Sequence, residues 1–142
     1  MREFDGYLQG LTKDKRTVST SERKARLLRD GFGKKPAFRC IIAREDTKPI
    51  GYLCYHEGYD PDEMRGKVIY VIDLFVTSSA RGSGIGRMLM DRVADVCANM
   101  DGIAVYVGVW RRNPKAIKFY MGIGAEFVED VPFMRWGKER WL

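Results

Sequence analysis

Residues 81–86 read RGSGIG, and they connect two stretches of different character. VIYVIDLFV (68–76) is apolar apart from Asp73, which is typical of a strand buried on both faces. After the glycines, apolar residues recur at helical spacing: Ile85, Met88, Leu89, Val93, Val96 and Cys97. IAVYVGVW (103–110) then predicts a second buried strand. Strand, helix and strand in this order predict a βαβ unit with parallel strands and a right-handed crossover.

The glycine-rich stretch has two interpretations. A turn from a strand into a helix exposes the first N–H groups of the helix, which bind anions together with the helix dipole. Glycines let the backbone approach a phosphate without a Cβ in the way, and Arg81 and Arg87 add charge. The alternative is a tight turn that needs glycine for its geometry alone.

The common nucleotide-binding loops do not fit this stretch. No Gly-Lys-Ser/Thr follows the glycines, as a Walker loop requires. The dinucleotide fingerprint needs a glycine at position 87 or 89, where Arg87 and Leu89 stand. A phosphate bound here therefore belongs to another kind of ligand.

The first part of the chain predicts a helix followed by a hairpin. Ser19 and Glu22 form a capping-box pattern that opens a helix over about 20–30, and Gly31 is expected to take the left-handed cap. Two strands are expected at 37–45 and 49–58 around the turn DTKP, with a loop over 59–67. Residues 1–18 predict one helix and a loop.

The last part predicts a helix and one or two strands. NPKAIKFYMGIG (113–124) begins with Asn113 and Pro114, which suits a helix start, and the helix is expected to end at Gly122 or Gly124. AEFVEDVPFMRWGKERWL (125–142) predicts the closing strands. The expected sheet is mixed, antiparallel at its start and parallel in its middle.

Size and composition are those of one domain spanning 1–142, since the chain has 142 residues and is 45% hydrophobic. Cys40, Cys54 and Cys97 lie in apolar runs without CxxC spacing, which favours buried free thiols and a cytoplasmic protein. No signal peptide and no membrane-spanning stretch are expected. The net charge of +6 favours a polyanionic partner, either nucleic acid or a phosphate-rich cofactor, or else reflects scattered surface lysines.

Two motifs occur in order on suitable elements. They are Arg81-x-x-Gly84-x-Gly86 and Asn113-x-x-Ala116-x-x-Phe119-Tyr120, the second followed by GAEF (124–127). The chain thereby resembles the GNAT superfamily of N-acetyltransferases over roughly residues 20–130. RDGFG with PAF (29–38), YDP (59–61), GKVIYVIDLFV (66–76) and FYMGIGA (119–125) are most similar to the spermidine/spermine (diamine) N-acetyltransferases.

The resemblance implies an α/β (α+β) fold with a mixed, mostly antiparallel sheet, helices on both sides and a central βαβ unit. Residues 1–12 would match the first helix of the family, so its usual first strand is expected to be missing. Where the diamine acetyltransferases have Glu then Asp before the glycine loop, this chain has Ile72 and Asp73. A homodimer is expected from the family.

The resemblance also implies direct acetyl transfer from acetyl-CoA to an amine, with Tyr120 as proton donor and Asp73 as the best-placed base. Cofactor contacts are expected from Leu74, Phe75, Val76, Arg81, Gly82, Ser83, Gly84, Ile85, Gly86, Arg87, Asn113, Ala116, Phe119 and Tyr120. The acceptor is expected near Tyr55, Glu57 and Asp60, and His56 is either structural or catalytic. No metal is expected.

Three kinds of function stay open. The first is acetylation of a small amine or polyamine, of an aminoglycoside-like drug, or of a protein amine. The second is a module that binds acetyl-CoA without catalysis. The third, a nucleic-acid-binding module, is disfavoured because the Lys and Arg residues are dispersed and no known reading motif occurs.

Overall fold

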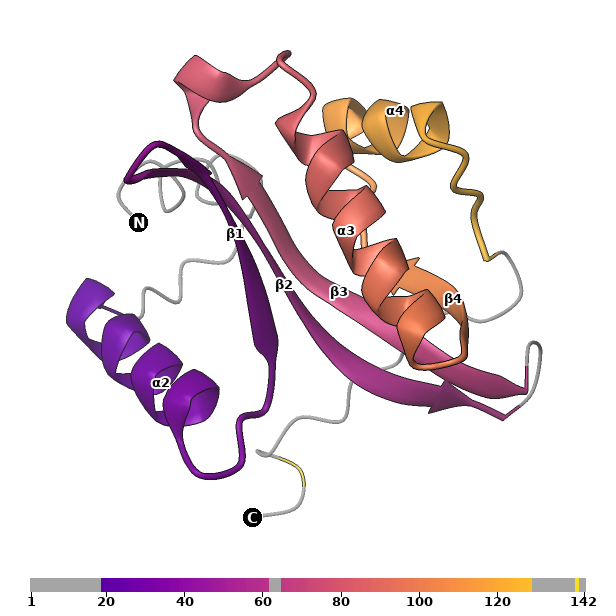
Figure 1. Ribbon diagram of the computed structural model, residues 1–142, viewed down its shortest axis with the longest axis horizontal. Helices are drawn as coiled ribbons and strands as arrows, with labels where there is room; N and C mark the ends of the chain where they lie inside the picture. Colours follow the sequence, from indigo (N-terminus) through magenta and orange to yellow (C-terminus); the bar gives the residue numbers. More distant parts are fainter. Residues whose placement is uncertain (1–18, 62–64, 129–139, 141–142) are drawn as a thin grey trace. The chain divides into compact units, whose positions relative to one another are not determined.

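The computed structural model describes residues 19–61, 65–128 and 140 (Figure 1), and the chain divides into two compact units, one up to Trp110 and one from Arg111. In the first unit, the elements are α2 (Thr20–Phe32), β1 (Arg39–Glu45), β2 (Lys48–Asp60), β3 (Gly66–Val76), η1 (Ser78–Ala80), α3 (Ile85–Asn99) and β4 (Gly102–Val107). The second unit contains α4 (Pro114–Gly122).

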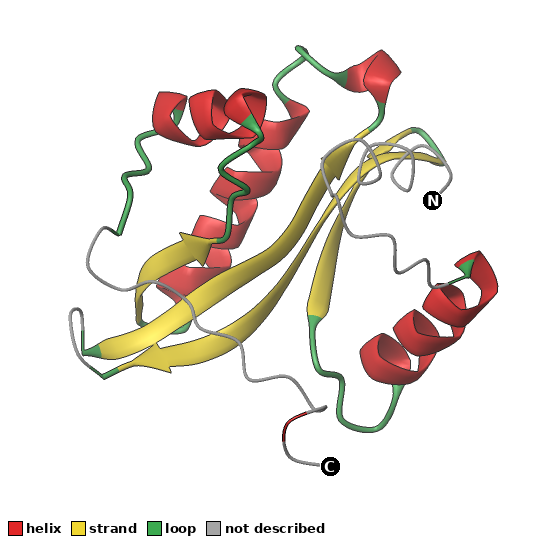
Figure 2. Ribbon diagram, turned by 180° about the vertical axis from the view of Figure 1, so that it is seen from behind, coloured by secondary structure: helices red, strands yellow, loops and turns green. Residues whose placement is uncertain are grey.

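The four strands form one sheet in the order β1-β2-β3-β4 (Figure 2). β1, β2 and β3 pair antiparallel, and β3 pairs parallel with β4. This confirms the predicted hairpin, the parallel strands of the βαβ unit and the mixed sheet. Asp46 turns the hairpin at φ 52, a left-handed conformation that Asp tolerates.

Several element ends differ from the sequence prediction. β2 continues to Asp60 and β3 begins at Gly66, so the loop expected over 59–67 is shorter than predicted. β4 ends at Val107 instead of residue 110. Residues 125–128 form no strand, and the rest of the C-terminal segment lies outside the described residues except Arg140. The helix predicted within residues 1–18 also lies outside them.

β3 contains a bulge. Cys54 of β2 pairs with Asp73, and the next residue, Tyr55, pairs with Val71, so Ile72 is an extra residue. A bulge bends the strand and redirects the side chains around it. The prediction that this strand is buried on both faces is therefore wrong, because Ile72 is 54% exposed. β4 is also only partly buried, and Ile103 on it is 42% exposed.

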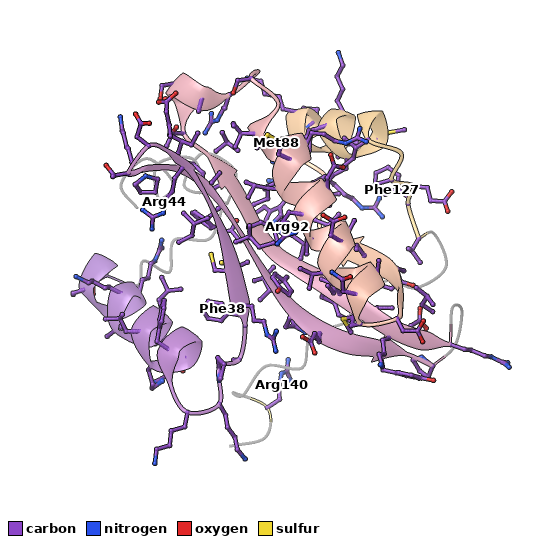
Figure 3. All side chains as sticks on the ribbon, in the orientation of Figure 1. Phe38, Arg44, Met88, Arg92, Phe127 and Arg140 are labelled. Atoms are coloured by element: carbon purple, nitrogen blue, oxygen red, sulfur yellow. The ribbon has the colours of Figure 1, made fainter. Side chains whose placement is uncertain are left out.

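α3 packs one side against the sheet. Its buried residues are Leu89, Val93 and Cys97, four apart, so they lie on one face of the helix. They form the core together with four sheet residues: Leu53, Tyr55, Ile69 and Val71. Figure 3 labels Met88 and Arg92 on the same helix, and both are exposed. Met88 therefore does not belong to the buried face.

α2 begins as predicted and ends differently. The Ser19 side chain accepts a hydrogen bond from the Glu22 amide at 3.2 Å, which confirms the cap. The prediction for Gly31 is wrong: the helix continues to Phe32, and Gly33 caps it at φ −75. Gly31 instead allows a close approach, because a Cβ there would lie 2.7 Å from the ring of Phe38 (Figure 3).

We predict that Leu89→Ala lowers the free energy of unfolding by about 2–5 kcal/mol, because it leaves a cavity between α3 and the sheet. Met88→Ala is the matched control, one residue away and 59% exposed, and should change it by less than about 0.5 kcal/mol. Urea unfolding of both variants measures the difference. Equal losses would contradict this assignment of the buried face.

Candidate functional site: the glycine loop and the Asp73 cluster

The loop before α3 requires glycine at two positions. Gly82 and Gly84 have φ values of 81 and 86, and Gly84 is the N-cap of α3. Side chains other than glycine rarely adopt this left-handed conformation. A Cβ built on either glycine would meet nothing within 4 Å. The geometry thus explains the glycines, and it also leaves open space beside the loop.

The first amides of α3 point out of the helix end. The first intrahelical hydrogen bond runs from the Met88 amide to the Gly84 carbonyl at 3.0 Å. The amides of Ile85, Gly86 and Arg87 precede it, and none of them donates to another described residue. These three N–H groups and the positive end of the helix dipole form a place where an anion is stabilised.

The two flanking arginines have different roles. Arg81 Nε donates to the Val76 carbonyl at 2.9 Å, and its guanidinium lies 5.7 Å from the centre of the Phe75 ring. Arg81 therefore ties the loop to the end of β3. Arg87 pairs with Asp91 one turn along α3 at 2.8 Å, and both side chains are exposed. Exposed pairs of this kind are weak, so Arg87 remains able to turn toward an anion.

Ser83 stabilises the turn between η1 and α3 with a hydrogen bond. Its Oγ donates to the Ala80 carbonyl at 2.6 Å. Together with Arg81 it fixes the residues that separate η1 from α3. The loop is thus held by its own side chains, which leaves its amides ordered in advance of any ligand.

The end of β3 extends beyond its pairing with β4. β4 pairs with β3 only from Lys67 to Val71, whereas β2 pairs with β3 up to Val76. Beyond Val71, the β4 side of β3 therefore has no strand partner among the described residues. Leu74, Phe75 and Val76 lie on this stretch.

Asp73 is a half-buried carboxylate held by a tyrosine. The Tyr52 hydroxyl donates to Asp73 Oδ2 at 2.7 Å. Burial raises the pKa of Asp73 above its usual range, while hydrogen bonds from Tyr52 and from the Leu74 amide oppose that rise. Burial, with the charge of Asp73 next, also raises the pKa of Tyr52. Tyr52 thus stays protonated as the donor.

Sequence reasoning found Asp73 but missed Tyr52. Cys54 pairs with Asp73, and Tyr52 lies two residues before Cys54 on the same face of β2. A register read from the sequence places these residues correctly only if the bulge at Ile72 is known. No local pattern in the sequence indicates that bulge.

The residues expected around the acceptor lie at several places. Tyr55 is 5% exposed and belongs to the core beneath α3. Glu57 is exposed and pairs with Arg39 at 3.4 Å. Asp60 accepts a hydrogen bond from the Tyr106 hydroxyl at 2.5 Å. The His56 ring stacks on Tyr70 at 5.2 Å. Tyr70 stacks on Tyr106 in turn, which joins His56 and Asp60 to one aromatic row.

The second unit carries the second motif on α4. Asn113 caps the helix, its side chain accepting from the Ala116 amide at 3.2 Å, and Pro114 follows at the first position. The rings of Phe119 and Tyr120 meet edge to face at 5.1 Å. Both are half-buried. The helix start and its end at Gly122 confirm the prediction for this segment.

No described helix is long and apolar enough to span a membrane. No group of three or more His, Cys, Asp or Glu side chains among the described residues is arranged to hold a metal ion.

The sequence matches the model of the acetyltransferase (GNAT) family over residues 6–124. It is 34% identical to the human spermidine/spermine N(1)-acetyltransferase-like protein 1 over 108 residues, which is 71% of this chain and 15% of that protein. It is 32% identical to the mouse thialysine N-epsilon-acetyltransferase over 117 residues, 77% of this chain and 66% of that protein. The chain therefore spans less than two thirds of either relative.

Solved structures have the same fold. An integron cassette protein from the mobile metagenome of V. cholerae has a TM-score of 0.80 and 29% identity, and the match covers 95% of this chain and 80% of that one. The aminoglycoside acetyltransferase AAC(6')-Iy, solved in complex with a CoA-containing bisubstrate analogue, has a TM-score of 0.70 and 19% identity, over 96% of this chain and 90% of that one. The fold class predicted from the sequence is confirmed.

We predict that Gly84→Ala lowers the free energy of unfolding by about 1–2 kcal/mol, because alanine is strained in the left-handed conformation. Gly108→Ala is the control: that glycine also has open space around its Cβ position but no positive φ, so the change should stay within about 0.5 kcal/mol. Chemical unfolding compares the two. Equal stability of the variants would mean that position 84 does not require glycine.

Proposed function

Because the chain belongs to the acetyltransferase (GNAT) family, we propose that it is an N-acetyltransferase that uses acetyl-CoA to acetylate a primary amine. The family predicted from the sequence is thereby confirmed. The observation that carries the proposal is the loop at the start of α3, where three amides donate to no other described residue and the Cβ positions of Gly82 and Gly84 face open space. A pyrophosphate needs such a site, and so the residues present fit the CoA part of the donor.

The donor would be held by two features of the first unit. The loop 81–86 would bind its pyrophosphate through the amides that follow Arg81, whose own amide donates to the Ser78 carbonyl, with charge from the Arg81 and Arg87 side chains. The stretch of β3 beyond Val71, where β4 no longer pairs, is the place that we propose for the amide-rich arm of CoA, with contacts to Leu74, Phe75 and Val76. Bound there, the donor supplies a thioester whose acetyl group an amine can attack.

The second motif, on α4, has proposed roles of its own. We assign Asn113, Ala116 and Phe119 to contacts with the CoA arm and Tyr120 to the leaving sulfur. Their support is the resemblance of α4 to the family motif and its intact cap. A hydrogen bond from Tyr120 stabilises the developing thiolate, since a phenol with a pKa near 10 does not readily protonate a thiolate with a pKa near 8.5 outright.

The acceptor amine must lose a proton. An alkyl ammonium has a pKa near 10.4, so very little of it is neutral at pH 7. We propose Asp73 as the base, directly or through a water, because it is the half-buried carboxylate next to the end of β3. The raised pKa of Asp73 brings it nearer to that task. Tyr52 positions its carboxyl group through the hydrogen bond to Oδ2.

We propose a small amine or polyamine as acceptor. The names of the human and mouse relatives specify spermidine/spermine and thialysine, which are flexible molecules with primary amines. The aminoglycoside acetyltransferases share the fold at 18–20% identity, which says nothing of the acceptor. Glu57 and Asp60 are candidate groups for a second ammonium, whereas Tyr55 supports the strand from the core. A protein amine is the runner-up.

Domain organisation, cellular location and oligomeric state are also proposals. We propose that 1–142 acts as one domain, that the protein is cytoplasmic and that it forms a homodimer. β1 supports the dimer, since it pairs only with β2 among the described residues and carries the exposed Ile42. An unpaired strand edge is a ready surface for another chain.

The proposed function is tested by cofactor binding and turnover. Acetyl-CoA at millimolar concentration should raise Tm, whereas ATP and duplex DNA should not. Spermidine, thialysine and sisomicin are then compared as acceptors by the release of the CoA thiol. Absence of a Tm shift contradicts the donor site, and a shift without thiol release from any acceptor favours a non-catalytic module.

The Tyr120→Phe variant should retain the Tm shift with acetyl-CoA, and its turnover should fall about 100-fold.

The role of Asp73 is tested by the pH dependence of kcat/KM. A base must be deprotonated, so activity should fall on the acidic side as Asp73 takes up a proton. The hydrogen bond from Tyr52 lowers the pKa of Asp73, so Tyr52→Phe should move this acidic limb to higher pH. Asp73→Asn should abolish the acidic limb and lower kcat/KM about 100-fold.

His56→Ala is the control for this profile. The His56 ring stacks on Tyr70, and the residue is exposed. If His56→Ala shifts the acidic limb and Tyr52→Phe does not, the base is the histidine and Asp73 is a structural residue.

A further inference from the structure

Two of the three cysteines lie directly opposite each other. Cys40 on β1 pairs with Cys54 on β2, and the Cys54 thiol donates to Cys40 Sγ at 3.4 Å. Directly opposed residues of antiparallel strands have Cα atoms about 4.5–5.5 Å apart, which is within the range of disulfides. A bond of about 2.05 Å between the two sulfurs therefore needs rotation of side chains and little movement of backbone.

The two thiols differ in access. Cys40 is exposed, whereas Cys54 is half-buried. Burial raises the pKa of Cys54, which keeps it protonated and available as the donor to Cys40. Cys40 is the thiol that a dissolved disulfide can reach, so it is the better first nucleophile. Cys97 is buried beneath α3 and donates to the Ala104 carbonyl, which excludes it from this chemistry.

We propose that Cys40 and Cys54 form a reversible dithiol–disulfide site that reacts with low-molecular-weight disulfides such as oxidised glutathione. In the first step the Cys40 thiolate attacks one sulfur of oxidised glutathione. A mixed disulfide forms, and one glutathione leaves as its thiolate. In the second step Cys54 loses its proton to solvent and attacks Cys40 Sγ. The protein disulfide forms, and the second glutathione thiolate leaves.

Overall, two protein thiols are oxidised to one disulfide, and one oxidised glutathione is reduced to two glutathiones. The proposed disulfide would also lie close to Asp73. Cys54 pairs on its other side with Asp73, so the disulfide would form directly across β2 from that carboxylate. The site itself stands on the two thiols alone and does not depend on the proposed acetyl transfer.

The test treats the folded, reduced chain with oxidised glutathione, followed by intact mass and tryptic mapping without reduction. Trypsin cuts after Arg39, Arg44 and Arg65, so the proposed disulfide joins the peptides 40–44 and 45–65. The wild type should lose two hydrogens, carry no lasting glutathione and yield this linked pair. Dithiothreitol should reverse the change. Cys97, in the peptide 93–111, should remain unmodified as an internal control.

Two conservative variants separate the roles of the thiols. Cys54→Ser should accumulate a stable glutathione adduct on Cys40, because the second step is blocked. Cys40→Ser should react at Cys54 at least about tenfold more slowly than the wild type reacts at Cys40, since the remaining thiol is half-buried and largely protonated.

Three results would overturn the proposal, and each is available from the wild type alone. They are a glutathione adduct that persists on Cys40, disulfide-linked dimers in place of the internal disulfide, and two thiols that stay unmodified.

Discussion

The extra residue in β3 sets which side chains of this strand face α3 and which lie on the side of Asp73. With Ile72 bulged out, Val71 and Leu74 both face the core beneath α3, although they are three residues apart. A regular strand places residues two apart on the same face, so one of the two would otherwise point away. The bulge therefore permits a buried apolar face on both sides of Asp73. It also comes directly after Val71, the last residue of β3 that β4 pairs.

The core is built on this arrangement. α3 contributes three buried residues, spaced four apart on one face of the helix. They pack against the apolar residues of β2 and β3 in a single core. Burial of such side chains contributes about 1.5–3 kcal/mol each, which is enough to hold one helix in one orientation. The start of α3 is fixed with it, so the amides that precede Met88 are ordered at the end of β3. Packing far from the loop thus orders the backbone amides at which we propose that the donor pyrophosphate binds.

The other face of the sheet carries a group of polar and aromatic residues. Asp73, Tyr52 and Cys54 lie together there, with Cys40 at the next strand. A carboxylate is costly to bury, and the Tyr52 hydroxyl is the partner that offsets part of the cost. The same environment raises the pKa of both Asp73 and Cys54. The carboxylate proposed as the base therefore lies next to the thiol pair proposed as a redox site.

The sequence by itself determined the βαβ unit, the hairpin, the caps at Ser19 and Asn113 and the glycine loop, because periodicity and turn residues act over a few neighbouring positions. It also identified the family, since two motifs occur in order. It did not determine the bulge at Ile72, the exposure of Met88, the partner of Asp73 or the pairing of Cys40 with Cys54. Those depend on the register between strands and on which helix face meets the sheet. Register is set by contacts between residues far apart in the chain, and only the tertiary structure decides it.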